Sequence, residues 1–281
     1  MDQKFINLFD RFTHGGMNRR EFMEKLTVLA GSTTAATALL PILENNYAHA
    51  DILPESDPRI VSETLTYAGG AGYLSKPSAE GKYPGVIVIH ENRGLNPHIK
   101  DVTRRMAAEG FAALAPDYLS ELGGTPEDAD KARDMIGTLK PEGVDASSSA
   151  ALAAVKANPA SNSKAGAMGF CWGGGAVNSL AVTNRGLSAG VAYYGRQPYA
   201  AVVPKITAPL LLHYGGLDER INAGIPAFEA ALKANKKVYE LYVYEGANHA
   251  FNNDSNAARY NKDVAELAWR RTVAFLKKYV N

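Results

Sequence analysis

The stretch from Ala165 to Trp172 constrains the fold more than any other part of the chain, because it predicts a strand that ends in a very tight turn. Residues 165–170 form a short apolar run of the strand type, and a helix is expected to follow Cys171. Gly169 and Gly173 stand two residues on either side of this cysteine. The pattern Gly-x-Cys-x-Gly between a strand and a helix has the form of a nucleophile elbow, in which glycines avoid a clash across the turn.

From residue 60 onward the chain alternates between strand and helix patterns. The β-branched run 85–90 predicts a strand buried on both faces, and residues 61–67 and 72–75 predict an antiparallel hairpin at a sheet edge. Further strands are expected at 111–115, 165–170, 189–194, 209–213 and 238–244, and helices at 97–109, within 126–139, 146–158 and 222–235, after Cys171 and at the C-terminus. This order predicts an α/β fold with a mostly parallel, doubly wound sheet and helices on both faces.

Residues 1–50 differ from the rest. The dipeptide Arg19-Arg20 precedes a modestly apolar run over 26–43, and Ala48-His49-Ala50 has the small-x-small pattern that signal peptidase cleaves. These features resemble a twin-arginine export signal that is cleaved after Ala50. We therefore expect an export signal over 1–50 and a single α/β domain over 51–281.

Such a signal predicts a periplasmic or secreted protein, with the twin-arginine export machinery as a partner. Two alternatives remain open for residues 1–50. One is a disordered or helical arm. The other is a retained membrane anchor, because the apolar run is near the lower length limit for spanning a bilayer.

Composition narrows the class of partner. The chain has 46% hydrophobic and 21% charged residues, and 30 Lys and Arg against 29 Asp and Glu give a net charge of +1. No basic run or patterned aromatic stripe suggests a nucleic-acid partner. Cys171 is the only cysteine, so no intramolecular disulfide can form.

The chain supplies a base and an acid for this cysteine in a fixed order. Asp218 follows the predicted strand 209–213, and His249 follows the predicted strand 238–244. The order nucleophile, acid, histidine is that of the α/β hydrolases, and the carboxyl ends of parallel strands share one edge of the sheet. His213 lies inside an apolar strand pattern, so His249 is the better base.

Each of these residues has a structural alternative when taken alone. Cys171 could be an inert buried thiol, Asp218 a helix cap and His249 an ordinary loop residue. The elbow places Cys171 at a helix N-terminus, which favours the thiolate, and the backbone N–H of Trp172 then points toward a developing oxyanion.

Six stretches carry a resemblance to a known family: VIVIHENRGLNPHIKD, FAALAPDYL, AMGFCWGGG, VAYYG, LLLHYGGLD and YEGANHAF. They resemble the dienelactone hydrolase family, the cysteine branch of the α/β hydrolases. The resemblance implies hydrolysis of an ester or lactone through an acyl-thioester, with Cys171 as nucleophile, Asp218 as orienting acid and His249 as base. It implies no metal and no organic cofactor, and no His/Cys spacing typical of a metal site is visible in the sequence.

The resemblance also assigns the residues around the nucleophile. It implies that the backbone amides of Trp172 and Asn92 form the oxyanion hole. It further implies that Glu91 partners the resting thiol, for which a plain loop carboxylate is the alternative. Tyr118, Trp172 and Tyr194 are expected to be pocket walls, although core packing accounts equally well for Tyr194.

Two positions depart from the family pattern. Members that hydrolyse dienelactone hold the substrate carboxylate with two arginines, where this chain has Glu121 and Asn253. A buried carboxylate without a cationic partner is costly, so dienelactone itself is a doubtful substrate. Arg93 and Arg196 follow other strand ends, and we hypothesise that they replace the missing anchors.

The expected function is therefore hydrolysis of a small ester or lactone by a Cys171–His249–Asp218 triad. A thioesterase or peptidase of the same fold is an alternative, since the substrate class depends on the pocket. A thiol-based oxidant sensor is a second alternative, although the chain has no resolving cysteine. A catalytically inactive binding module is a third, and the intact set of triad residues argues against it.

Overall fold

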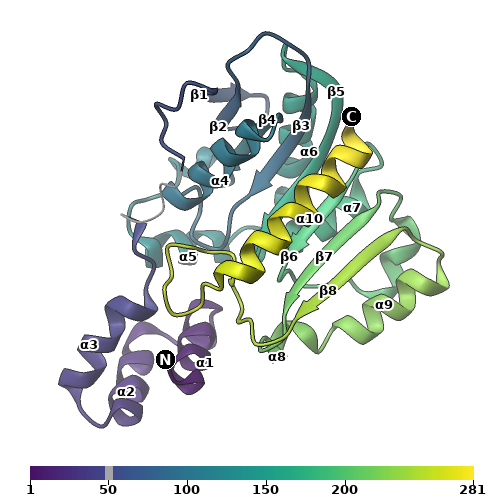
Figure 1. Ribbon diagram of the computed structural model, residues 1–281. Helices are drawn as coiled ribbons and strands as arrows, with labels where there is room; N and C mark the ends of the chain where they lie inside the picture. Colours follow the sequence, from purple (N-terminus) through teal and green to yellow (C-terminus); the bar gives the residue numbers. More distant parts are fainter. Residues whose placement is uncertain (48–52) are drawn as a thin grey trace.

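The computed structural model describes residues 1–47 and 53–281. Figure 1 shows one twisted sheet covered by helices, which we call the body, and a separate group of N-terminal helices beside it. The predicted cleavage site at Ala48-His49-Ala50 lies outside the described residues.

The body contains an eight-stranded sheet in the order β1-β2-β4-β3-β5-β6-β7-β8. The strands are β1 (Ile60–Tyr67), β2 (Gly70–Pro77), β3 (Tyr83–Ile89), β4 (Ala112–Asp117), β5 (Ser161–Phe170), β6 (Gly190–Tyr193), β7 (Leu210–Gly215) and β8 (Tyr239–Tyr244). β1 pairs with β2 and β2 with β4 antiparallel, and all other pairs are parallel. The expected edge hairpin and the mostly parallel α/β sheet are confirmed.

Helices cover both faces of this sheet. The body's helices are α4 (Pro97–Ala108), η2 (Ser120–Leu122), α5 (Ala129–Gly137), α6 (Pro141–Ala157), α7 (Trp172–Thr183), η3 (Ala200–Lys205), α8 (Glu219–Asn222), α9 (Ile225–Ala234) and α10 (Lys262–Val280). Apolar residues of α4 and α10 join one core cluster, and those of α6, α7 and α9 join the other. The helix expected within 222–235 is α9, which begins after its N-cap Gly224, and the short helix α8 precedes it.

Strand β3 shows how the sequence builds these two cores. Its residues 86–89 are fully buried, with Val86 and Val88 in one cluster and Ile87 and Ile89 in the other. Side chains alternate across a strand, so a continuous β-branched run fills both faces of the sheet. Burial of each such side chain stabilises the fold by about 1.5–3 kcal/mol.

The topology places the ligand edge. β4 lies on one side of β3, and β5 lies on the other, so the strand order reverses at β3. In open α/β sheets the crevice at such a reversal, beyond the carboxyl ends of the strands, is where ligands bind. Cys171 directly follows β5 at this edge.

The N-terminal segment, residues 1–47, forms three helices: α1 (Gln3–Thr13), α2 (Arg19–Ala30) and α3 (Thr33–Leu43). The apolar run 26–43 is broken at Gly31, which has a φ of 82° and ends α2 in the left-handed conformation. In the described parts of the chain no single helix is long and apolar enough to cross a membrane. Only α2 and α3 together reach that length and composition, with a bend of 113° between them.

The twin arginines have a structural setting in this segment. Asn18 caps α2 and forms a reciprocal capping box with Glu21, so the arginines occupy its first turn. Arg19 pairs with Asp130 of the body at 2.7 Å, and Arg20 pairs with Glu24 within the helix. These contacts do not test export, which stays a prediction.

The N-terminal segment has its own apolar core and packs on the body. Phe12 and Phe22 stack with ring centroids 4.6 Å apart, inside a cluster that also includes Phe9, Leu26 and Leu43. The contacts to the body are mostly polar: Asp10 with Arg220, Arg19 with Asp130, Gln3 with Asn248, and the backbone oxygen of Leu43 with Asn256. Residues 1–47 thus form helices that dock beside the carboxyl ends of the strands (Figure 1).

Candidate active site

Cys171 occupies a strained turn between β5 and α7. Its φ of 55° and ψ of −114° lie outside the regions that most residues adopt. A Cβ built on Gly169 would overlap the backbone of Gly173, and one built on Gly173 would overlap the backbone of His90. The two glycines are therefore required by close backbone approach, as the elbow pattern predicted.

The structure brings Asp218 and His249 together. Asp218 follows β7 and His249 follows β8, and their Oδ2 and Nδ1 atoms are 2.5 Å apart. Both residues are about 95% buried, with exposed fractions of 4% and 5%. Asp218 also caps α8 by accepting from the backbone N–H of Ile221, so the capping role and the orienting role coexist.

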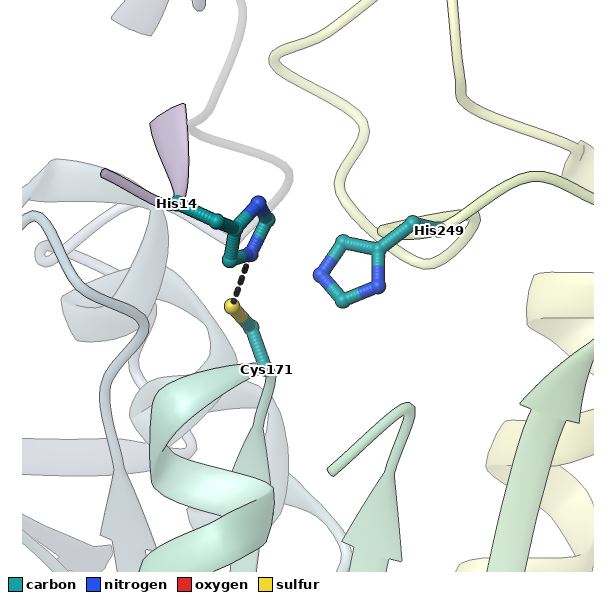
Figure 2. A group of neighbouring side chains, drawn as sticks. All are labelled: His14, Cys171 and His249. Carbon is teal, nitrogen blue, oxygen red and sulfur yellow. Dashed lines mark hydrogen bonds between the residues drawn. The ribbon is translucent and has the colours of Figure 1, made fainter. Parts of the chain in front are cut away.

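The thiol itself is hydrogen-bonded to a residue that the sequence analysis did not consider. His14, at the C-terminal end of α1, has its Nε2 3.1 Å from Cys171 Sγ. Its ring packs edge-on against the ring of His249, with centroids 4.7 Å apart. Figure 2 shows the His14 ring bonded to the sulfur and the His249 ring to one side of both, with its Nε2 turned toward them. That atom is buried and has no hydrogen-bond partner among the described residues.

His14 is in turn held by Asp10. Its Nδ1 lies 2.7 Å from the Asp10 backbone oxygen and 3.2 Å from Asp10 Oδ1. Burial disfavours the charged imidazole, but the Cys171 sulfur and Asp10 outweigh it and raise the pKa of His14 to about 9. Burial likewise opposes ionisation of Asp10, yet the neighbouring histidines and Arg220 hold its pKa well below the usual range.

The sequence analysis missed His14 because it assigned residues 1–50 to an export signal and searched for a base only after Cys171. One signal was available: Asp10 and His14 are four residues apart, which places them on one face of a helix. Nothing in the sequence indicates that this face meets a cysteine 157 residues away.

The residues expected to form the oxyanion hole lie next to the elbow. Trp172 is the first residue of α7, and Asn92 follows β3. Neither backbone N–H has an acceptor among the described residues. The Asn92 side chain donates to the backbone oxygen of Thr13 at 2.6 Å, so the N-terminal segment also contacts this part of the site.

Glu91 is close to the elbow but is not bonded to the thiol. Its Oε2 accepts from Asn253 Nδ2 at 2.8 Å, and its Oε1 is buried without a partner among the described residues. In this structure His14 occupies the position at the sulfur that was expected for Glu91. Asn253, at one of the two expected anchor positions, therefore fixes Glu91. Glu121, at the other, is exposed in η2.

The expected pocket walls are mostly buried aromatic rings. Trp172 stacks on His90 with centroids 5.4 Å apart, and Tyr118 packs edge-on against both rings. The hydroxyl groups of Tyr118 and Ser148 are hydrogen-bonded to each other. The Tyr194 ring packs against the His249 ring. Trp172 and Tyr194 also line the larger of the two cavities at the site, whereas Tyr118 lines neither.

His213 is part of the core, as expected. Tyr244 and Thr272 are hydrogen-bonded to its two ring nitrogens. Burial lowers the pKa of His213 to about 3, which keeps the imidazole neutral. It is not available as a base at the site.

Two cavities meet at Cys171 and His249. The charged cavity, of about 450 Å³, lies against the N-terminal segment and is lined by Arg19, Glu44, Glu91, Arg93, Asp130 and Arg259 among others. The apolar cavity, of about 1000 Å³, is lined by Ile136, Leu139, Val144, Trp172, Val182 and Val202 among others. His14 and Asn92 border both cavities.

The two arginines proposed as anchors face different cavities. Arg93 lines the charged cavity and pairs with Asp130 at 2.8 Å, a carboxylate that also binds Arg19 and Arg133. Arg196 lines the apolar cavity, and no carboxylate pairs with it among the described residues. Arg196 is thus the arginine whose charge is available to a ligand.

Comparison with known proteins shows the family of this chain. The sequence model of the dienelactone hydrolase family matches residues 71–280. A protein of Saccharolobus solfataricus named "Putative carboxymethylenebutenolidase" is 37% identical over 229 residues, which cover 69% of this chain and 88% of that protein. One of the same name from Methylorubrum extorquens is 30% identical over 275 residues, 92% of this chain and 94% of that protein.

A solved structure agrees with the fold. The crystal structure of a "Putative Dienelactone Hydrolase" from Klebsiella pneumoniae superposes with a TM-score of 0.72 at 28% identity. The match covers 78% of this chain and 99% of that one.

Proposed function

The chain belongs to the dienelactone hydrolase family, and from that premise we propose that it hydrolyses small esters or lactones with Cys171 as nucleophile, His249 as base and Asp218 as orienting acid. One observation carries the proposal. The unpartnered Nε2 of His249 is buried beside a cysteine in a strained elbow, and its Nδ1 is held by Asp218. A base oriented by a carboxylate next to a nucleophile is the arrangement that acyl transfer requires.

The proposed cycle uses no group outside the chain except substrate and water. His249 Nε2 takes the proton of Cys171, and the thiolate attacks the carbonyl carbon while the backbone N–H groups of Trp172 and Asn92 stabilise the oxyanion. His249 returns the proton to the leaving alkoxide, which leaves an acyl-thioester on Cys171. Water activated by His249 then hydrolyses the thioester, releasing the acid and restoring the thiol.

His14 must leave the thiol for this cycle to start. In the described conformation its Nε2 is bonded to the sulfur, and its ring lies beside the space that a bound carbonyl would need. We therefore propose that the active form has His14 displaced from Cys171, by a shift of the end of α1 or by release of the N-terminal segment.

The apolar cavity is the better fit for the substrate's organic group. Its lining is largely aliphatic and aromatic, and burial of such a group there contributes about 25 cal/mol per Å². Arg196 borders this cavity and could pair with an anionic substituent. We therefore propose small aliphatic or aromatic esters and lactones as substrates, with carboxylate-bearing ones held by Arg196.

The test is release of p-nitrophenol from a panel of neutral and anionic p-nitrophenyl esters by the full, reduced chain. Cys171→Ala should lower turnover by about 10⁴-fold or more, because the nucleophile acts as a unit with its base. Turnover that survives this substitution, or a folded wild type that hydrolyses none of the esters, would rule out the proposal.

Arg196→Ala and Arg93→Ala form a matched pair for substrate charge. Loss of a charge-assisted hydrogen bond costs about 1.5–3 kcal/mol, so Arg196→Ala should raise KM for carboxylate-bearing esters about 10- to 100-fold and leave neutral esters unchanged. Arg93→Ala should have a smaller effect, because Asp130 already neutralises Arg93. Equal effects of both variants on both ester classes would contradict a role for Arg196.

A further inference from the structure

The site contains a set of metal-ligand atoms that the hydrolytic cycle does not use together. One ligand atom each from His14, Cys171 and His249 lies within 4.8 Å of the other two. Figure 2 shows that all three point into one space: His14 from the end of α1, Cys171 from the elbow and His249 from the loop after β8. Two imidazoles and a thiolate form a ligand set that suits Zn²⁺ and similar ions.

Both histidines are oriented as metal-bound histidines usually are. His14 Nδ1 lies 2.7 Å from the Asp10 backbone oxygen, with the Asp10 carboxylate 3.2 Å away, and His249 Nδ1 is held by the Asp218 carboxylate. A backbone carbonyl or a carboxylate on the far nitrogen fixes the ring so that Nε2 can face an ion, and such partners are typical around bound zinc. His249 Nε2 is buried and has no partner among the described residues, which is an independent sign of a ligand.

The distances require only small movements. Ligand atoms around tetrahedral zinc are about 3.3–3.6 Å apart, as zinc–nitrogen and zinc–sulfur bond lengths dictate. His14 Nε2 and Cys171 Sγ are already 3.1 Å apart, and the three atoms span at most 4.8 Å. The charged cavity of about 450 Å³ adjoins the cluster, so a water could complete the coordination.

We propose that, in the chain that still carries residues 1–50, His14, Cys171 and His249 bind one Zn²⁺-like divalent ion, with a water as fourth ligand, and that this ion fastens the N-terminal segment over the active site. Binding displaces the one proton that Cys171 and His14 share, so one proton is released and nothing is oxidised or reduced. The metal-bound form is inactive toward esters, since both nucleophile and base are occupied. That consequence rests on the proposed function, whereas the binding itself does not.

The direct test is Co²⁺ titration of the full-length, reduced, metal-free chain. Tetrahedral coordination with a thiolate should give intense ligand-field bands and a thiolate-to-cobalt charge-transfer band, both removed stoichiometrically by Zn²⁺. His14→Ala should weaken binding by more than the 10- to 100-fold typical of losing an outer-shell partner, and Asp10→Asn by about that 10- to 100-fold. His98→Gln is the matched control, because His98 also pairs with a carboxylate, Asp254, but lies outside the cluster.

The outcomes separate this proposal from the hydrolytic one. Absence of the charge-transfer band, or equal affinity in His14→Ala and wild type, would overturn the three-residue site whether or not the chain hydrolyses esters. If the chain does hydrolyse esters, His14→Ala should retain turnover and require far more Zn²⁺ for half-inhibition than wild type. Equal sensitivity of the two to Zn²⁺ would refute the role of the ion in closing the site.

Discussion

Two aspartate–histidine pairs flank the same sulfur, and they are held in very different ways. Asp218 and His249 lie on loops after β7 and β8, whose parallel register runs from Leu210 to Gly215 on β7. Asp10 and His14 lie on α1 and at its end. The chemistry is nearly the same, but the first pair is fixed by the central sheet and the second by the docking of a separate helical segment.

The two pairs differ in what must move before each histidine can leave the Cys171 sulfur. β7, which precedes Asp218, is buried along its whole length, and Asp218 and His249 are themselves buried and bonded to each other. The N-terminal segment is held mostly by polar contacts at its rim, such as Arg19 with Asp130 and Asp10 with Arg220. Such contacts open at a lower free energy than a buried sheet, so the pair now at the thiol is the more easily displaced of the two.

Replacing each histidine in turn should give the largest difference between the two pairs, and the difference is in ester turnover. His249→Ala should lower ester turnover by about 10⁴-fold or more, because it removes the proposed base. His14→Ala should leave kcat unchanged or raise it, since it frees the thiol. Steady-state kinetics on the same ester measure both, and a larger loss in His14→Ala than in His249→Ala would reverse the assignment of the base.

Weakening the core of the N-terminal segment should expose the thiol. Phe22 is fully buried between Phe9 and Phe12, and removal of such a ring costs about 3–5 kcal/mol. Phe22→Ala should therefore speed alkylation of Cys171 by iodoacetamide. The rate should rise about tenfold for each 1.4 kcal/mol by which the free energy of docking of the N-terminal segment is weakened. Mass spectrometry gives the rate on a single site, because Cys171 is the only cysteine.

Val28→Ala is the matched control on the same helix, since Val28 is 83% exposed. It should leave the alkylation rate at the wild-type value. An alkylation rate in Phe22→Ala no faster than in Val28→Ala would mean that the segment does not shield the thiol.

Two histidines with shifted pKa values, His14 and His213, should give opposite pH dependence of stability. The pKa of His14 is raised to about 9, so its contribution is full below the unfolded pKa of 6.5 and is lost as pH rises through 9. The pKa of His213 is lowered to about 3, so the unfolded chain binds the extra proton and stability falls as pH drops from 6.5 toward 3.

Urea unfolding across this pH range checks both signs. Each group contributes at most about 1.4 kcal/mol per pH unit between its two pKa values. His14→Gln should flatten the alkaline side of the profile, and His213→Gln the acidic side. A wild-type profile whose alkaline slope survives in His14→Gln would show that His14 is not charged beside Cys171.

The twin arginines should give the smallest structural effect. Arg19 is about half exposed where it pairs with Asp130, and such ion pairs contribute about 0.2–1 kcal/mol. The double variant Arg19→Lys, Arg20→Lys should therefore change the free energy of docking of the N-terminal segment by no more than about 1 kcal/mol. The rate of Cys171 alkylation measures this change. If residues 1–50 act as a twin-arginine signal, the same double variant should stop export in a fractionation assay, and unchanged export would contradict the signal.

The sequence by itself determined the sheet and the elbow. Strand and helix patterns depend on periodicity along the chain, so the run 85–90 predicted β3, and Gly169 and Gly173 predicted a turn that only close backbone approach explains. The order of Cys171, Asp218 and His249 on strand ends was likewise legible, because parallel strands bring their carboxyl ends to one edge.

Only the tertiary structure decided what surrounds the nucleophile. The contact of His14 with Cys171 joins residues 157 positions apart through the docking of a separate helical segment, which no local pattern specifies. The same holds for the bond from Asn253 to Glu91 and for the neutralisation of Arg93 by Asp130. Local sequence sets which element forms, whereas the partner of a side chain depends on how distant elements pack, and that is decided by the whole fold.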